Sequence, residues 1–307
     1  MRGWITPYRS YEGGPLTRRE LMRSAALLAA GAVVPASAQD AGAAFPWAPL
    51  VDHIQINSDN VPKSTEFYQQ VLGLNLLRVG PPNDQQCCPQ ESAFFGVGNR
   101  LILAIRKRPG RNIDHWALLM NGGVDQAKVT QQLTTRGAPP VMHDLAGFYA
   151  GDPDGVLVQL MGQPGPGSPT SSPAVPAAAA AGRMTFDWAP LIDHIQINSD
   201  NVRRLTEYYQ KVLNLDLLRV GPPNNRECCP DESSFFGVGK RLILAIRKAK
   251  PAPMIDHYAL LMTNFNKDAV IKELGARGAS TKEDATGFHV VDPDGVKIQL
   301  MGQPGPA

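Results

Sequence analysis

The sequence carries little net charge and few aromatic residues. Lysine and arginine total 30 against 28 aspartate and glutamate residues, which leaves a formal charge of +2, and aromatic residues make up 7% of the chain. Nucleic-acid binding is usually signalled by a basic patch interleaved with aromatic side chains, and no such stripe is present. The composition therefore gives no electrostatic reason to expect nucleic acid, and we expect a small-molecule substrate or ligand.

Cysteine is also scarce, with four residues in two adjacent pairs, Cys87-Cys88 and Cys228-Cys229. Adjacent cysteines can join only through a strained ring, and a CC pair lacks the spacing of a zinc site. In an oxidising compartment disulfides are expected, so a bridge between the two pairs is one reading. Vicinal disulfides and free thiols are the alternatives.

The N-terminal segment has the features of an export signal. Arg18 and Arg19 precede an apolar run at 25–34, and Ala36-Ser37-Ala38 offers small residues for cleavage. The pattern resembles a twin-arginine (Tat) signal peptide at 1–38, the alternative being a basic tail. The run is too short and too rich in alanine to span a membrane, and no other stretch could do so. We expect a periplasmic or extracellular protein.

The strongest feature of the chain is an internal repeat. Residues 45–107 and 186–248 match at most positions without a gap, and both repeats finish with DPDGV and QLMGQPGP. We therefore predict two domains, at 45–162 and 186–303, joined by a linker at 163–185 that is rich in Pro, Ala, Gly and Ser. Each domain has about 120 residues, which is enough to bury a core of its own.

Each repeat alternates strands and helices in a fixed order. Apolar periodicity predicts two rounds of β-α-β-β-β, so the chain contains four such units and belongs to the α+β class. The DPDG segment reads as a turn between the last two strands, without a catalytic role. The predicted elements of the first repeat are strands at 51–58, 74–79, 93–97, 100–107, 113–120, 141–143, 148–151 and 156–161, and helices at 61–72 and 124–135.

The first strand of each repeat presents a polar row. With a period of two, His53, Gln55 and Asn57 face one side while Ile54 and Ile56 face the other. Such a row lines a cavity or lies on a half-exposed sheet edge. The matching row of the second repeat is His194, Gln196 and Asn198.

The order of these motifs resembles the vicinal oxygen chelate superfamily, whose members include glyoxalases, extradiol dioxygenases and bleomycin-binding proteins. The resemblance rests on an Asp-His strand, a helix ending in Phe-Tyr-x-x-Val-Leu-Gly, a second Asp-His strand and a final Asp-Pro-Asp-Gly strand, met twice. It implies two cup-shaped mixed sheets, each holding a divalent ion (Fe, Mn, Zn, Ni or Co) on two histidines and a glutamate. The metal positions that it implies are His53, His115 and Gln159, and His194, His257 and Gln299.

Both repeats have glutamine where the family's metal-dependent members have glutamate. An amide oxygen is neutral, so the metal loses one unit of charge balance and the side chain cannot act as a base; glutamine is nevertheless an accepted ligand within the superfamily. Strand alternation turns the preceding Asp52 and Asp114 away from the cup, which leaves them a role at the strand start or in salt bridges.

Other residues are candidates for substrate binding or proton transfer. Arg106 and Arg247 alternate onto the same strand face as Ala104 and Ala245. If that face lines the cup, each guanidinium could hold an anionic oxygen of the substrate. The alternative is that both arginines lie at a solvated strand end. Tyr149 and His289 occupy matching positions before DPDG, where either could act as acid or base, so the two cups can differ in activity. His143 has no counterpart and reads as a surface residue. The predicted substrate-binding set is Gln55, Asn57, Arg106, Gln196, Asn198 and Arg247.

Two functions fit this pattern. One is a metal-dependent dioxygenase-like or glyoxalase-like enzyme that acts on a small oxygen-rich or aromatic substrate. The other is a metal-free protein that sequesters a small molecule, as bleomycin-resistance proteins do. The paired histidines favour the enzyme and the two glutamines favour the binding protein. The sequence leaves open whether the domains pair within the chain or through a homodimer.

Overall fold

The computed structural model describes residues 45–80, 91–98, 100–109, 113–123, 125–143, 147–162, 184, 186–221 and 232–305. These ranges belong to one compact unit, Gln39–Ala307. The predicted signal segment, most of the predicted linker and all four cysteines lie outside the described residues. No helix within those ranges is long and apolar enough to cross a membrane.

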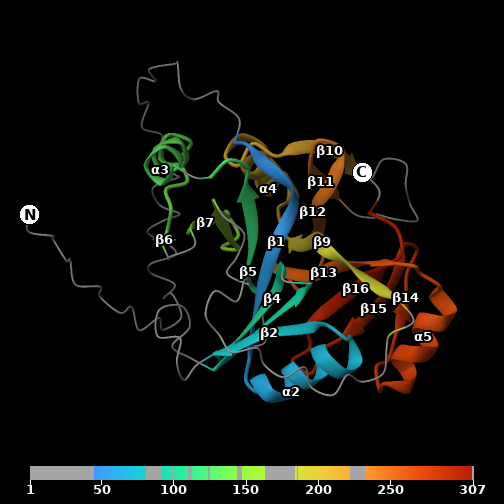
Figure 1. Ribbon diagram of the computed structural model, residues 1–307. Coiled ribbons are helices and arrows are strands. Elements are labelled where there is room, and N and C mark those ends of the chain that lie inside the picture. The colour runs from blue at the N-terminus through green and yellow to red at the C-terminus, as the bar shows by residue number, and fades with distance from the viewer. Residues whose placement is uncertain are drawn as a thin grey trace, which may run out of the picture. The chain divides into compact units, whose positions relative to one another are not determined.

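The first repeat contains two β-α-β-β-β units, as predicted (Figure 1). The first helix is α-helical over its first half and π-helical over its second, whereas the matching α4 is α-helical throughout. The elements are β1 (Trp47–Ser58), α2 (Val61–Glu66), η1 (Phe67–Val71), β2 (Asn75–Gly80), β3 (Ser92–Val97), β4 (Arg100–Lys107), β5 (Ile113–Met120), α3 (Gln126–Thr135), β6 (Met142–His143), β7 (Gly147–Gly151) and β8 (Leu157–Met161).

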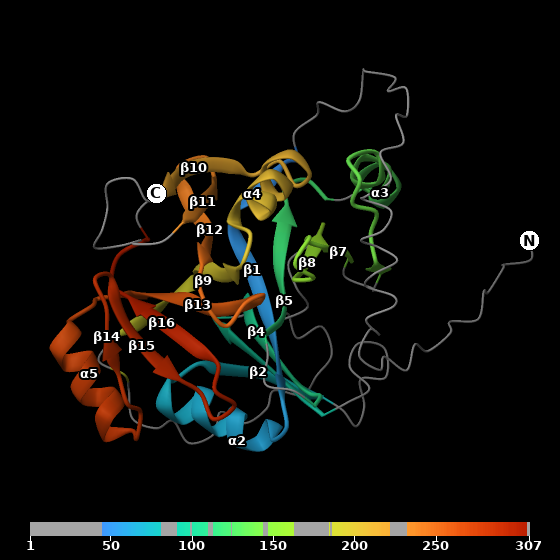
Figure 2. The same cartoon turned by 180° about the vertical axis from the view of Figure 1, so that it is seen from behind.

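The second repeat follows the same order, seen from behind in Figure 2. Its elements are β9 (Asp187–Ser199), α4 (Val202–Lys211), β10 (Asp216–Gly221), β11 (Ser233–Val238), β12 (Arg241–Lys248), β13 (Met254–Thr263), α5 (Lys267–Ala276), β14 (Lys282–Glu283), β15 (Gly287–Val291) and β16 (Lys297–Met301).

Local sequence fixes the ends of the first helix in each repeat. The Asn60 side chain accepts a hydrogen bond from the Lys63 N–H at 3.1 Å, and Asn201 caps α4 in the same way. Just beyond the helices, Gly73 and Asn214 take positive φ angles of 63° and 57°. Glycine and asparagine tolerate this left-handed conformation better than other residues, so the chain can turn back toward the sheet.

Each repeat forms an eight-stranded mixed sheet. In the first, the strand order is β2-β3-β4-β1-β5-β8-β7-β6, with β1 parallel to β4 and antiparallel to β5. The second has the order β10-β11-β12-β9-β13-β16-β15-β14. The sheets meet where β1 pairs with β9 at Val51 and Ile192. The two repeats therefore pair with each other within one chain.

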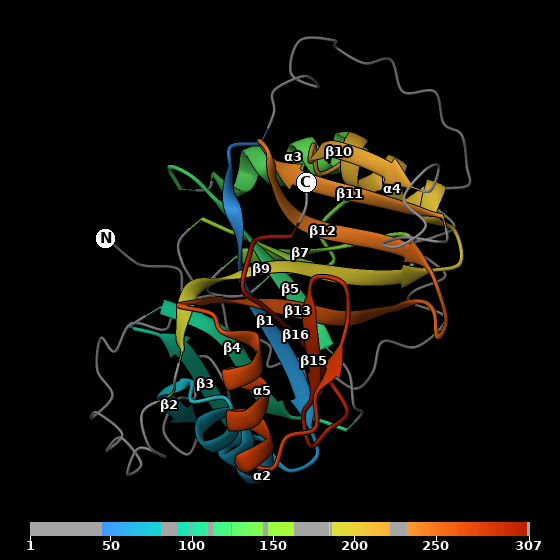
Figure 3. The same cartoon turned by 90° about the vertical axis from the view of Figure 1, so that its right-hand side faces the viewer.

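The hydrophobic core is shared between the repeats, which corrects the expectation that each domain buries its own. One continuous cluster joins residues of both sheets and their helices. Trp47 Nε1 donates to the Leu213 carbonyl at 2.7 Å, and Trp188 Nε1 donates to the Leu72 carbonyl at the same distance. Figure 3 shows α2 of the first repeat beside α5 of the second.

The DPDG turns form hydrogen bonds that connect the two repeats. As predicted they are turns, with Gly155 and Gly295 at φ angles of 87° and 86°. Their first aspartates reach into the other repeat. The Tyr209 hydroxyl donates to Asp152 Oδ2 at 2.9 Å, and the Tyr68 hydroxyl donates to Asp292 Oδ2, also at 2.9 Å. These reciprocal contacts cannot be predicted from the sequence pattern.

Candidate functional site

The sheet face opposite the shared core carries the polar rows, and we call it the cup face. On β1, Ile54 and Ile56 are fully buried in the core, while His53 and Gln55 lie on the cup face. These polar side chains are themselves buried, with His53 at 6% exposure and Gln55 at 1%. The row therefore does not lie on a half-exposed edge.

A β-bulge places Asp52 on the cup face, whereas strand alternation alone predicts the opposite face. Val51 pairs with Leu118 and Ile54 with Trp116, so three steps along β1 match two along β5. The extra residue lies at Asp52-His53. A bulge of this kind interrupts alternation and turns two consecutive side chains to the same side.

A second bulge does the same for Asp114. Gln55 pairs with His115 and Ile56 with Ile113, so one step on β1 matches two on β5 and Asp114 is the extra residue. Both bulges recur in the second repeat, at Asp193-His194 and at Asp256.

Each aspartate holds the histidine that follows it. In the first cup, His53 Nδ1 lies 2.8 Å from Asp52 Oδ1, and His115 Nδ1 lies 2.9 Å from Asp114 Oδ2. The two imidazole rings face each other edge-on with centroids 5.7 Å apart. The salt bridges expected for the two aspartates are formed with arginines instead: Arg100 Nη2 lies 3.6 Å from Asp52 Oδ2, and Arg108 Nη1 lies 3.4 Å from Asp114 Oδ1.

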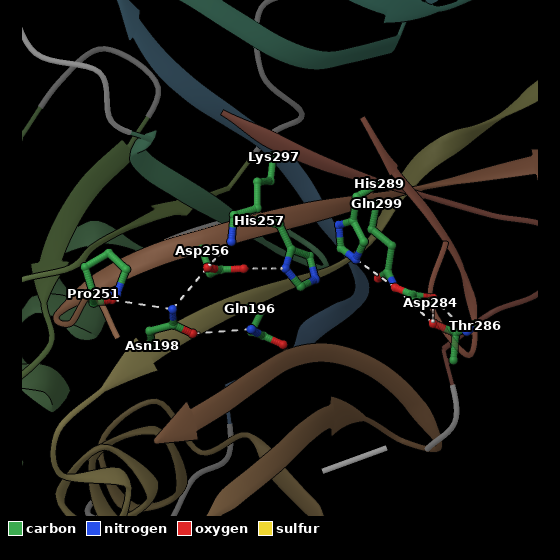
Figure 4. Close-up of polar contacts among 10 residues, drawn as sticks. All are labelled: Gln196, Asn198, Pro251, Asp256, His257, Asp284, Thr286, His289, Lys297 and Gln299. Carbon is green, nitrogen blue, oxygen red and sulfur yellow. Dashed lines mark hydrogen bonds and ion pairs between the residues drawn. The ribbon is translucent and has the colours of Figure 1, made fainter. Parts of the chain in front are cut away.

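The second cup repeats this geometry. Nδ1 of His194 lies 2.8 Å from Asp193 Oδ1, and Nδ1 of His257 lies 2.9 Å from Asp256 Oδ2. The ring centroids are 5.8 Å apart. Figure 4 shows the Asp256–His257 pair with its neighbours.

Burial keeps one histidine of each cup neutral, His115 in the first and His257 in the second. It lowers the pKa of His115, and it lowers the pKa of His257 to about 4, although the adjacent aspartates act in the opposite direction. For Asp114, burial favours the neutral acid. The hydrogen bond from His115, the positive charge of Arg108 and the hydrogen bond from Asn57 outweigh that and bring the pKa of Asp114 to about 2. A neutral imidazole that donates Nδ1–H to a carboxylate keeps its lone pair on Nε2, the state required of a metal ligand.

The glutamines lie on the cup face of the last strand in each repeat. Gln159 pairs with Ala117 on β5 and with Tyr149 on β7. Gln299, exposed by only 5%, occupies the same place in the second cup, and its Nε2 donates to Asp284 Oδ2 at 2.7 Å. Sequence reading did not single out Asp284.

The predicted substrate-binding amides support the Asp-His pairs. Gln55 Nε2 donates to Asp114 Oδ2 at 3.1 Å, and Asn57 Nδ2 lies 3.3 Å from Asp114 Oδ1. In the second cup, Asn198 Nδ2 donates to Asp256 Oδ1 at 3.0 Å, and Gln196 Nε2 lies 3.3 Å from Asn198 Oδ1. Contact with substrate remains a prediction for these four residues.

The predicted arginines lie beside the same rows. Arg106 pairs with Asn57 across β4 and β1, and Arg247 pairs with Asn198. Burial lowers the pKa of His115, and the positive charge of Arg106 lowers it further. The Arg106 guanidinium therefore contributes to the electrostatics of the cup. His143 is exposed, as expected of a surface residue.

An apolar floor continues the row away from the histidines. Phe94 pairs with Ala104, Ala104 with Gln55 and Gln55 with His115, which sets these side chains side by side on one face. The Arg78 guanidinium lies 4.0 Å above the Phe94 ring. The same row recurs in the second repeat, where Arg219 covers Phe235 at 4.0 Å. The repeated FFGVG and LLRVG segments hold these residues, but their pairing could not be read from the sequence.

The two cups differ at the predicted acid–base position. Tyr149 is buried, and its ring centroid lies 5.0 Å from that of His115. His289 lies 5.0 Å from His257 by the same measure, and its Nε2 donates to Asp284 Oδ2 at 2.7 Å. His289 Nδ1 is buried and has no hydrogen-bond partner among the described residues.

A cavity of about 450 Å³ adjoins the second cup. Its lining includes Leu191, Asp193, Arg241, Leu242, Leu261 and Gly305. The Gly305 N–H donates to Asp193 Oδ1 at 3.1 Å, so the chain after β16 passes beside the Asp193–His194 pair. A cavity of this size suits a small molecule.

The donors present fit a divalent ion on two imidazole nitrogens and one amide oxygen. The buried atoms His115 Nε2 and Gln299 Oε1, from corresponding sets in the two cups, have no hydrogen-bond partner within the described ranges. No group of three or more His, Cys, Asp or Glu side chains among the residues described could hold a metal by itself. The glutamine oxygen is therefore needed to complete either site, and ions that accept imidazole suit this set.

The fold and the doubled Asp-His pairs define a class of tandem βαβββ proteins with one cup in each repeat. The chain matches the Glyoxalase/Bleomycin resistance protein/Dioxygenase superfamily model over residues 50–160 and 191–300, and it belongs to that superfamily. No curated protein shows significant sequence similarity to it.

Solved structures share the fold at low sequence identity. The Mn(II)-bound glyoxalase from Novosphingobium aromaticivorans is 16% identical, with a TM-score of 0.62 and coverage of 84% of this chain and 83% of that one. The E323L mutant of homoprotocatechuate 2,3-dioxygenase from Brevibacterium fuscum is 14% identical, with a TM-score of 0.63 and coverage of 86% and 74%. The 2,3-dioxygenase LapB from Pseudomonas sp. KL28 is 15% identical, with a TM-score of 0.62 and coverage of 83% and 92%.

Proposed function

We propose that this protein is an exported, divalent-metal-dependent enzyme of the dioxygenase or glyoxalase type that acts on a small oxygen-rich or aromatic molecule. The observation that carries the proposal is the pair of facing histidines in each cup, each held through Nδ1 by its own aspartate. Aspartates in this position fix the tautomer and the direction of a metal-binding imidazole. The structural similarity to a Mn(II)-bound glyoxalase and to 2,3-dioxygenases supports the same class.

The residues of each cup have separate tasks under this proposal. In the first cup, Nε2 of His53 and of His115 and the Gln159 oxygen would hold the ion. When bound, the metal would supply a Lewis acid for adjacent substrate oxygens. Phe94 and Ala104 would pack against the apolar part of the substrate, and Arg106 would stabilise a negatively charged oxygen.

Proton transfer would differ between the cups. In the second cup, His289 is oriented by its bond to Asp284, which leaves Nδ1 to accept a proton from a substrate hydroxyl. In the first cup, the Tyr149 hydroxyl takes the corresponding place. We therefore expect the second cup to be the faster catalyst for a substrate that must lose a proton.

Metal counting tests the proposal. The protein is stripped with a chelator and equilibrated with Mn²⁺, and bound metal is measured by mass spectrometry. We expect two ions per wild-type chain, one in the His53→Ala/His115→Ala variant and one in the His194→Ala/His257→Ala variant. The exposed-residue control, His143→Ala, should keep two. Failure to bind Fe, Mn, Zn, Ni or Co would refute the enzyme proposal.

Export is tested separately. We expect cell fractionation to find the mature chain, beginning after Ala38, outside the cytoplasm. Replacement of Arg18 and Arg19 by lysine should retain the precursor inside the cell. Normal export of that variant would contradict a twin-arginine signal.

A metal-free binding protein is the second candidate, favoured by the neutral Gln159 and Gln299. It predicts that an aromatic ligand binds equally well with and without a chelator. It also predicts that His53→Ala and His194→Ala leave that binding unchanged. A loss of ligand binding on metal removal would eliminate it.

A further inference from the structure

The second cup contains a carboxylate one hydrogen bond beyond the third ligand position. Asp284 precedes β15, and its Oδ2 accepts from Gln299 Nε2 at 2.7 Å. Gln299 Nε2 also lies 2.9 Å from Thr286 Oγ1. Figure 4 shows both contacts at the edge of the cup that also holds His289.

These contacts determine which end of the Gln299 amide faces the cup. The NH₂ group donates to two acceptors, so the amide oxygen must point the other way. A flipped amide would set its oxygen against the carboxylate, which is repulsive. Consistent with this, Gln299 Oε1 is buried and accepts no hydrogen bond from the described residues.

Asp284 is itself firmly held as an anion. Its Oδ1 accepts from the backbone N–H groups of Thr286 and Gly287, each at 2.7 Å. Its Oδ2 accepts from His289 Nε2 at 2.7 Å. With the Gln299 amide, four hydrogen-bond donors converge on this carboxylate, and such donors favour the ionised form.

We propose that Asp284 is a positioning residue that replaces the missing glutamate of the second cup. It turns the Gln299 oxygen inward as a ligand atom, and it supplies the negative charge from one hydrogen bond away. A carboxylate that accepts from the amide N–H also draws electron density onto the amide oxygen, which makes that oxygen a better donor. This inference rests on the proposed metal-binding function of the same cup.

The effects of substitutions at Gln299 and Asp284 should depend on each other. If the charge belongs at Asp284, then Gln299→Glu alone would place two carboxylates in contact at the present 2.7 Å separation. The pair would repel, or one member would take up a proton. Asp284→Asn should relieve that conflict, because an asparagine amide can donate to the new carboxylate.

The test measures Mn²⁺ affinity by calorimetry in a His53→Ala/His115→Ala parent, which isolates the second cup. We expect Asp284→Asn to weaken binding about 10- to 100-fold, the usual effect of losing an outer-shell partner. In the Q299E background, the same Asp284→Asn substitution should instead tighten binding. A change of sign between backgrounds is the signature of a displaced charge, and a loss of folding could not produce it.

Two further variants complete the test. Glu283→Gln removes the neighbouring carboxylate, which pairs with Lys267 and does not touch Gln299, and it should leave the affinity unchanged. If Asp284→Asn loses its wild-type circular dichroism, Thr286→Val removes the other acceptor of Gln299 and should weaken Mn²⁺ binding several-fold.

The outcomes separate this inference from the proposed function. A parent that binds no metal refutes the metal-dependent function and the inference with it. If the parent binds Mn²⁺ but Asp284→Asn leaves the affinity unchanged or weakens it both with Gln299 and in the Q299E background, only the role of Asp284 is overturned.

Discussion

Asp152 is buried where the first repeat meets the second, and its ionisation should make protein stability depend on pH. Its Oδ2 accepts from the Tyr209 hydroxyl, and its Oδ1 accepts from the backbone N–H groups of Asp154 and Val156 at 2.9 Å. Burial outweighs these bonds and raises the pKa of Asp152 from 3.8 to about 7. The folded protein therefore binds this proton more tightly than the unfolded chain does.

The sign and size of the effect follow from linkage. Stability from this group is fully present below pH 4 and is lost as the pH rises through 7. With a pKa of about 7 in the folded state, the loss between pH 5 and pH 8 amounts to about 2.5 kcal/mol. Asp292, raised to about 6 by the same cause, should lose about 1.5 kcal/mol over that interval.

Unfolding measurements on wild type alone would not reveal the contribution of Asp152 to the pH dependence of stability. The pKa of His257 is lowered by burial, so its contribution to stability is present above pH 6.5 and lost as the pH falls toward 4. That slope opposes the slope of Asp152 in the same range. Subtracting the unfolding free energy of a variant from that of wild type cancels the contribution of every titratable group that the two proteins share.

Asp152→Asn is the variant that isolates the effect. Equilibrium unfolding in guanidinium chloride is measured at pH 5, 6, 7 and 8 for wild type and variant. The unfolding free energy of wild type minus that of Asp152→Asn should be larger at pH 5 than at pH 8 by about 2.5 kcal/mol. Asp292→Asn is the matched control, with the same sign and about 1.5 kcal/mol. A difference that stays flat across this range would refute the reasoning for Asp152.

Two more predictions concern the cups and the shared core. Asp114→Asn, measured by calorimetry with Mn²⁺ in a His194→Ala/His257→Ala parent, should weaken binding about 10- to 100-fold, because an amide no longer fixes the His115 tautomer; unchanged affinity would show that the tautomer does not matter. Trp47→Phe removes the 2.7 Å bond to the Leu213 carbonyl and should cost about 1–3 kcal/mol of unfolding free energy, because a buried acceptor loses its partner. A denaturation midpoint equal to wild type would contradict it.

The strand and helix order could be read from the sequence because each βαβββ unit shows clear periodicity. The pairing of His53 with His115 was also predictable, since both follow aspartate on the first strand of a unit. Their side chains face each other because β1 and β5 are adjacent, which the family resemblance implied.

The position of the aspartates could not be read in the same way. Alternation assumes one residue for every residue on the neighbouring strand, and a bulge breaks that assumption without any mark in the sequence. Alternation therefore predicts the wrong side of the sheet for Asp52 and Asp114.

Contacts between distant segments were likewise hidden. Tyr68 and Tyr209 read as core residues of amphipathic helices, and nothing local indicates a carboxylate partner in the other repeat. Asp284 lies fifteen positions from Gln299 and reads as part of a turn. A hint was available in the Asp-Ala-Thr-Gly segment, because an aspartate two or three residues before a backbone N–H often accepts from it.

The shared core has a consequence for how the chain reaches its native state. While the ribosome is still making the second repeat, the apolar residues of the first have no complete partner surface, because part of their core has not been synthesised. We expect the first repeat to remain incompletely packed until residues near Asp292 emerge and meet Tyr68. Both cups should then form together, in a single cooperative step late in biosynthesis.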